Sequence, residues 1–142
     1  MIDNIKVAAK NFCTHQLGME CHNTKEIPQM RTFIAYIDIK TQSNEKFRVF
    51  LAANEQFMQN VATLFLEEEK SDEETLKDMV LETANLIIGS AKVLAQDSDN
   101  PYSIGTPYFQ SITAFNVEYD EVAVLSYEQS KLIIAIKDLN AA

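Results

Sequence analysis

The chain has 142 residues, 46% of them hydrophobic, and its 12 basic and 21 acidic residues give a formal net charge of −9. This length suits one domain with a core of its own, which we expect to span residues 1–142. Nucleic acids and anionic membrane surfaces are disfavoured as partners, because their charge has the same sign. The N-terminus lacks the pattern of a signal peptide, and no apolar run approaches the roughly 20 residues of a membrane span, so we expect a cytoplasmic protein.

The N-terminal half combines helices with a hairpin. Apolar residues at helical spacing predict a first helix between Asp3, a possible N-cap, and Gly18, a typical stop signal. Alternating apolar residues predict two strands, Arg31 to Lys40 and Lys46 to Ala52, which a polar turn joins into a hairpin. Asn54 follows the second strand and is placed to cap a second helix.

The C-terminal half begins with the longest predicted helix, from about Asp72 to Ala95. Ser71 and Glu74 have the spacing of a capping box at its start. After a polar loop, three segments have the character of short strands: residues 110–117, 121–127 and 131–137. We therefore predict an α+β fold in which long helices cover a mainly antiparallel sheet.

Two cysteines lie near the N-terminus, each close to a histidine. Cys13, His15, Cys21 and His22 are the residues that could form a zinc site, but they lack the paired spacing that structural zinc sites usually show. Two free thiols are the preferred interpretation, and we expect no metal in this chain.

Four residues of the long helix fall on one stripe, at spacings i, i+4, i+7 and i+11. They are Asp78, Glu82, Asn85 and Gly89, and they lie within about 60° of one another on a helical wheel. The predicted core face lies on the opposite side and consists of Leu76, Val80, Ala84, Ile87, Ala91 and Leu94.

The composition of this stripe has two interpretations. Asn and Gly are poorer helix formers than the Glu, Lys or Gln that would fill a purely solvated stripe. Leu81, Leu86 and Val93 flank the polar residues, and apolar surroundings of this kind are typical of a docking surface. The simpler alternative is the solvated side of an amphipathic helix, so the decision depends on residues farther along the chain.

The pattern Asp78-x3-Glu82-x2-Asn85 is followed, after 21 intervening residues, by Pro107. It resembles the motif of the CheC, CheX and FliY phosphatases, in which Asp or Ser precedes ExxN and a proline follows. The order of elements resembles that family along nearly the whole chain. The resemblance implies a CheC/CheX-like fold with pseudo-symmetric halves, each opening with a long helix.

The first helix resembles a second copy of the site that lacks its acid. It reads Asn4-x3-Ala8-x2-Asn11, with alanine in place of the glutamate. CheC proteins carry two such motifs and CheX proteins carry one. The chain is therefore similar to the CheX type, with one expected site.

The resemblance implies hydrolysis of the aspartyl phosphate of a CheY-like receiver domain in chemotaxis or two-component signalling. Asn85 would orient the attacking water and Glu82 would pair with the receiver's lysine, while Asp78, Gly89 and Pro107 would support the site. We expect no cofactor in this chain, because the receiver brings the Mg2+. The resemblance also implies a homodimer.

Two other functional classes stay open. A receiver-binding or dimerising adaptor could keep the fold and the motif without turnover. A small-molecule site could use aromatic residues near the proline loop, namely Tyr102, Tyr108, Phe109 and Phe115, although such residues more often pack in cores or interfaces. An enzyme of the Ser/His or Cys/His kind is poorly supported, because no nucleophile motif accompanies the two histidines.

Overall fold

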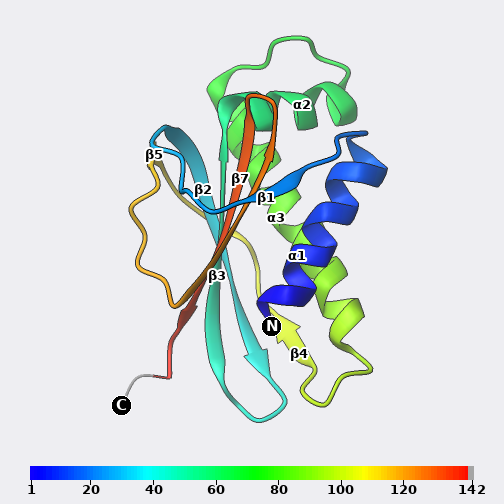
Figure 1. Cartoon of the computed structure of the whole chain (residues 1–142), viewed down its shortest axis with the longest axis vertical. Helices are drawn as coiled ribbons and strands as arrows, with labels where there is room; N and C mark the ends of the chain where they lie inside the picture. The colour runs from blue at the N-terminus through cyan, green and yellow to red at the C-terminus, as the bar shows by residue number, and fades with distance from the viewer. Residues whose placement is uncertain (141–142) are drawn as a thin grey trace.

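The computed structural model describes residues 1–140 and has an α+β fold, as the sequence predicts (Figure 1). In chain order its elements are α1 (Ile2–Asn11), the π-helical turn η1 (Phe12–Gln16), β1 (His22–Thr24), β2 (Arg31–Thr41), β3 (Lys46–Asn54), α2 (Glu55–Leu66), α3 (Glu73–Ala95), β4 (Tyr102–Ile104), β5 (Tyr108–Ala114), β6 (Glu121–Tyr127) and β7 (Ser130–Asp138). All strand pairs are antiparallel.

The sheet has an internal two-fold relationship. Its order is β1-β6-β7-β3-β2-β4, with β5 also paired to β2. This order maps onto its own reverse when β1 exchanges with β4, β2 with β6, and β3 with β7. In each half a helix leads into a short edge strand, and that strand pairs with the hairpin of the other half. The topology therefore has the pseudo-symmetric halves that the resemblance implies.

The helices α1 and α3 cover one face of the sheet side by side (Figure 1). Every second residue of the central strands points toward these helices, and these residues and the helices form the main core. Its largest fully buried side chains include Ile5, Phe33, Leu51, Phe57, Leu76, Ile87 and Leu125. This core arises because every second residue of a strand is buried and because apolar residues recur at helical spacing along α3.

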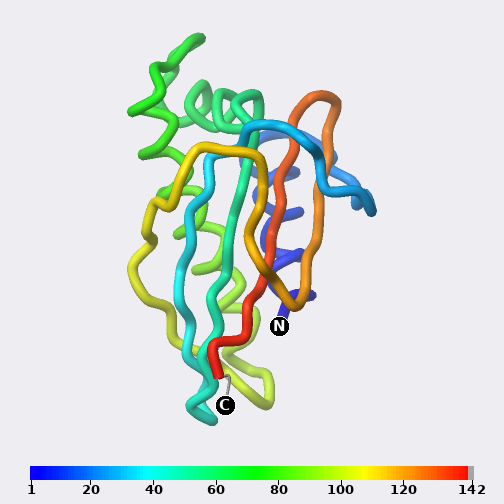
Figure 2. The backbone as a smooth tube through the Cα atoms, turned by 90° about the vertical axis from the view of Figure 1, so that its left-hand side faces the viewer, coloured from blue at the N-terminus to red at the C-terminus, as the bar shows by residue number. Residues whose placement is uncertain are grey.

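The opposite face of the sheet is covered in part by the segments before β2 and between β5 and β6 (Figure 2). Phe115 and Val117 pack there against a smaller cluster that includes Ile34 and Phe50. The predicted strand over 110–117 therefore ends early, at Ala114, because the next residues leave the ladder to cover this face.

Both predicted caps at the starts of the two long helices are wrong. Asp3 lies inside α1, whose N-cap position is Met1. Helix α3 is capped by Asp72, whose Oδ1 accepts the Thr75 N–H at 2.8 Å. Ser71 cannot take that role, because its N–H donates to Gln59 Oε1 at 2.8 Å and its hydroxyl donates to Glu68.

Other local predictions are confirmed. Asn54 caps α2, with its Oδ1 accepting the Phe57 N–H at 3.1 Å. Gly18 has φ +66°, the left-handed conformation that ends helices and suits glycine. The predicted hairpin of β2 and β3 is present, with Lys40 opposite Lys46.

Within residues 1–140, no helix combines the length and the apolar character that crossing a membrane requires.

Candidate functional site

The polar stripe of α3 faces solvent. The side chains of Asp78, Glu82 and Asn85 are exposed, and Gly89 is half-exposed on the same line. None of the three polar side chains makes a hydrogen bond or an ion pair to another group of residues 1–140. These groups are therefore free to meet an incoming partner without first breaking an internal contact.

Contacts near the start of α3 fix its position. Hydrogen bonds from the side chain and backbone of Thr75 lower the pKa of the capping Asp72, which keeps its carboxylate charged at the positive end of the helix dipole. Arg31 at the start of β2 forms a salt bridge with Glu73 at 3.0 Å. Lys77 lies with its Nζ 4.9 Å from the centre of the Phe109 ring on β5. Each of these exposed contacts is weak, and they add to the packing of the buried face of α3 in the main core.

The buried side of α3 completes this placement. Leu76, Val80, Ala84, Ile87 and Ala91 are all buried, as predicted. The prediction is wrong for the sixth residue of that face, Leu94, which is 46% exposed. Leu94 is exposed because it lines a groove between α3 and the segment formed by α1 and η1.

This groove, of about 520 Å³, runs between α3 and the α1–η1 segment, directly beside the polar stripe. Its α3 wall is formed by Leu86, Ser90, Val93 and Leu94, and its other walls by Ala8, Asn11, Phe12, His15, Gln16 and Phe65. Leu86 and Val93 are 36% and 63% exposed, which confirms that apolar side chains border the stripe. The sequence pattern indicated the α3 wall, but it gave no signal for the α1–η1 wall, because that pairing depends on the tertiary fold.

The helix α1 carries no second acidic site. Ala8, at the position of the missing acid, is 2% exposed and packs in the main core, whereas Asn11 is exposed. A glutamate at position 8 would bury its charge beneath the groove, which is costly without a partner. The site of α3 therefore has no acidic counterpart on α1.

Pro107 lies in the connection between β4 and β5, and it is half-buried. The preceding Gly105 donates its N–H to the Asp38 backbone oxygen at 2.9 Å, which holds this connection against β2. Pro107 therefore belongs to a connection at the β2 edge of the sheet, between two strands that both contact α3.

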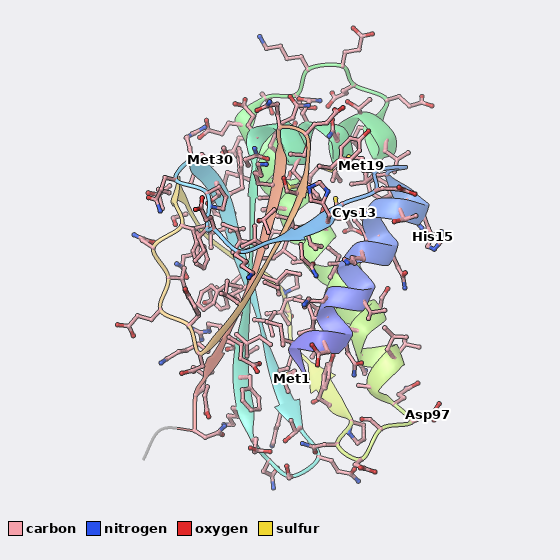
Figure 3. All side chains as sticks on the ribbon, in the orientation of Figure 1. Met1, Cys13, His15, Met19, Met30 and Asp97 are labelled. Carbon is pink, nitrogen blue, oxygen red and sulfur yellow. The ribbon has the colours of Figure 1, made fainter. Side chains whose placement is uncertain are left out.

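The cysteines and histidines of the N-terminal region do not form a metal cluster. Across residues 1–140 no three His, Cys, Asp or Glu side chains are grouped as metal ligands. Cys13 lies on the sheet side of its helical turn, while His15 lies on the opposite side (Figure 3).

The fold is similar to several solved structures. CheX from Vibrio vulnificus superposes with a TM-score of 0.80 at 17% identity, covering 96% of this chain and 97% of the other. A chemotactic CheC-like protein from Shewanella oneidensis MR-1 gives 0.74 at 15% identity, with the same coverage. The CheX–CheY–BeF3–Mg2+ complex from Borrelia burgdorferi gives 0.69 at 19% identity, again over 96% and 97%. At these identities the likeness shows the fold alone.

The sequence itself carries the family relationship. No curated protein matches the chain. The family model of the chemotaxis phosphatase CheX matches residues 33–130, a span that includes the stripe of α3 and Pro107. That span is more than half of the chain, and the fold agrees with it. The chain belongs to the chemotaxis phosphatase CheX family.

Proposed function

We propose that this protein hydrolyses the aspartyl phosphate of a CheY-like receiver domain. The observation that carries the proposal is the stripe of α3, where Glu82 and Asn85 are exposed and unpaired one turn apart on a fixed helix. This stripe lies within the span that matches the CheX family. The Borrelia burgdorferi CheX structure with CheY, BeF3 and Mg2+ supports a receiver as the partner.

The proposed chemistry needs only a positioned water. An acyl phosphate is already activated, and the receiver supplies the Mg2+ that neutralises the phosphoryl oxygens, so this chain needs no cofactor of its own. The Asn85 amide oxygen accepts a hydrogen bond from the water, while its NH2 group donates to a phosphoryl oxygen. The water then attacks phosphorus in line with the aspartate oxygen that leaves, and its proton passes to a phosphate oxygen.

Glu82 has a separate role, which is docking. Its exposed carboxylate would form a charge-assisted pair with the receiver's lysine and so place Asn85 over the phosphoryl group. A role as general base is disfavoured, because an anion aimed at an anionic phosphoryl group raises the barrier. Asp78, one turn earlier, and Gly89, one turn later than Asn85, extend the same contact surface, and Pro107 shapes the adjoining edge.

The experiment follows phosphate release from a phosphorylated CheY-type receiver with and without this protein. We expect acceleration by the natural chain, and its loss in Glu82→Ala and in Asn85→Ala. Because both residues are exposed and unpaired, each substitution is expected to change the free energy of unfolding by about 0.5 kcal/mol or less. The matched controls are Glu118→Ala and Asn116→Ala, which are exposed between β5 and β6 on the other side of the sheet.

Binding measurements separate the enzyme from an adaptor. Titration with a receiver carrying BeF3 and Mg2+ reports docking without turnover. We expect Asn85→Ala to bind and Glu82→Ala to bind more weakly. Binding by the natural chain with no acceleration of phosphate loss, across several cognate receivers, would identify an adaptor and refute the catalytic proposal.

Three further features belong to the proposal. We propose that residues 1–142 act as one domain, that the protein works in the cytoplasm, where its receiver partner would be, and that it forms a homodimer. Light scattering coupled to gel filtration measures the last of these, and a monomer at micromolar concentration would contradict it.

A further inference from the structure

The groove between α3 and the α1–η1 segment has the composition of an interface core. Among the described residues that line it there is no Asp, Glu, Lys or Arg, although 23% of the chain is charged. Four of its lining side chains are large, apolar and exposed, namely Phe65, Leu86, Val93 and Leu94. Exposed apolar side chains that gather in one place, with charges absent from the centre, are typical of a surface that another protein covers.

The wall opposite α3 is built by an unusual helical turn. In η1 the Leu17 N–H donates to the Phe12 oxygen at 3.2 Å, five residues back, which is the hydrogen bond of a π-helix. Phe12, His15 and Gln16 of this turn all line the groove. Turns of the π type are rare and frequently lie at functional sites. The proposed phosphatase site does not use this turn, so its place on the groove indicates a separate task for this wall.

The groove opens directly beside the proposed phosphatase site. Leu86 follows Asn85 in the chain and lies one turn after Glu82. At about 1.5 Å per residue, Leu86 and Ser90 of the groove lie about 6 and 12 Å beyond Glu82 along the helix axis. A standard interface buries about 800 Å² on each partner. A receiver that pairs with Glu82 and reaches Asn85 therefore also covers the groove.

This inference rests on the proposed phosphatase function. We propose that the groove selects the receiver by holding one large apolar side chain, aliphatic or aromatic, from the receiver's surface. The lining offers no carboxylate or ammonium group, so burying a charged side chain there would be costly. A groove of about 520 Å³ is in the range that holds a drug-sized molecule, so it accommodates any single side chain. The selected receiver would carry this side chain about 6 to 12 Å from the lysine that pairs with Glu82.

The surroundings of the groove favour a receiver over a second copy of this chain. A homodimer through the groove would also cover Glu82 and Asn85, and it would exclude the receiver from the proposed site. The exposed carboxylates of Asp78 and Glu82 continue the same surface along α3. The complementary surface is therefore apolar beside the groove and basic beside the stripe.

The test measures binding of a CheY-type receiver loaded with BeF3 and Mg2+, which does not turn over. Ser90→Trp fills the groove from an exposed position, and we expect at least tenfold weaker binding with an unchanged circular dichroism spectrum. Its matched control is Val7→Trp, exposed on α1 outside the groove. Phe65→Ser is expected to weaken binding as well. Leu66→Ser, similarly exposed on α2 but outside the groove, is expected to leave binding unchanged.

A double-mutant cycle identifies the side chain of the receiver. Each exposed large apolar residue of the receiver within that distance of its lysine is changed to serine, one at a time. We expect one of these substitutions to weaken binding about tenfold with the natural chain but less than about twofold with Phe65→Ser, because residues in contact are not additive. In phosphate release, the groove variants are expected to raise KM and leave kcat unchanged, since they remove binding that is equal in the ground and transition states.

Natural affinity in Ser90→Trp, or additive effects throughout the cycle, would refute the proposal. A smaller oligomer in Ser90→Trp than in the natural protein, measured by light scattering, would also refute it, because a second copy would then occupy the groove. Binding that depends on the groove without accelerated phosphate loss would refute the phosphatase proposal alone. Acceleration that no groove variant alters would refute this inference alone, and failure of every receiver to bind would refute both.

Discussion

Substituting Gly89 by alanine separates the stability of α3 from its use as a contact surface. Gly89 lies well inside the helix, and a Cβ built there meets no atom within 4 Å. Its backbone does not have the positive φ that an L side chain would resist. Within this chain, the added methyl group therefore acts only through helix propensity.

The expected size of this effect follows from host–guest data. Alanine in place of glycine in a helix interior stabilises by about 0.5–1 kcal/mol, which for a chain of this length corresponds to a rise in thermal midpoint of about 2–4 °C. The same substitution at Gly18, where φ is +66°, is expected to lower the midpoint, because alanine resists the left-handed conformation. The two substitutions are therefore expected to shift the thermal midpoint in opposite directions, because only Gly18 has a positive φ.

The effect on a partner is opposite. If the receiver packs along the stripe, the methyl group at position 89 pushes against it, and we expect at least a tenfold weaker interaction with the BeF3 form, or about 1.4 kcal/mol. Circular dichroism measures the midpoint, and titration with the receiver measures affinity. A destabilised Gly89→Ala variant would refute the account of the helix, while unchanged affinity would show that the partner does not reach this turn.

Two other outcomes follow from the structure. Val93→Ser is expected to weaken receiver binding measurably, because Val93 borders the stripe. The control is Val7→Ser, which is expected to leave affinity unchanged, because Val7 is 48% exposed on α1 outside the groove. Equal effects of the two substitutions would show that the groove is not part of the docking surface. Tyr102→Phe is expected to raise the free energy of unfolding by about 1 kcal/mol, since the buried hydroxyl has no hydrogen-bond partner among residues 1–140. Burial raises the pKa of Tyr102 to about 12, so the unfolded chain releases this proton first and the natural protein loses stability as pH rises from about 10 to 12. Denaturant unfolding at several pH values is expected to show less of this alkaline loss in the variant, and an equal loss would refute the assignment.

The elements with a strong local signal were predictable from the sequence. The cap of α2 was predictable because the Asn54 side chain accepts a hydrogen bond from a residue only three positions along the chain, and the hairpin was predictable because apolar residues alternate on both of its strands. The long helix was predicted to within one residue at its start. Such features depend on residues that are close together in the chain, so the periodicity of the sequence predicts them.

Features that depend on distant residues were missed. Edge strands β1 and β4 have three residues each, too few for a periodic pattern, and they exist because the other half offers them a hairpin edge. The exposure of Leu94 depends on the position of α1, and the sequence of α3 does not specify that position. The stripe was predicted from spacing together with family resemblance, while its roles in hydrolysis stay predictions.

The exchange of edge strands between the two halves also has a consequence for folding. The residues of β1 are synthesised before most of the chain, yet they pair with β6, with His22 opposite Ser126. The first half therefore cannot complete its sheet until the last hairpin is available. Contacts between residues so far apart in the sequence slow folding, and the helix that carries the proposed site packs against elements of both halves.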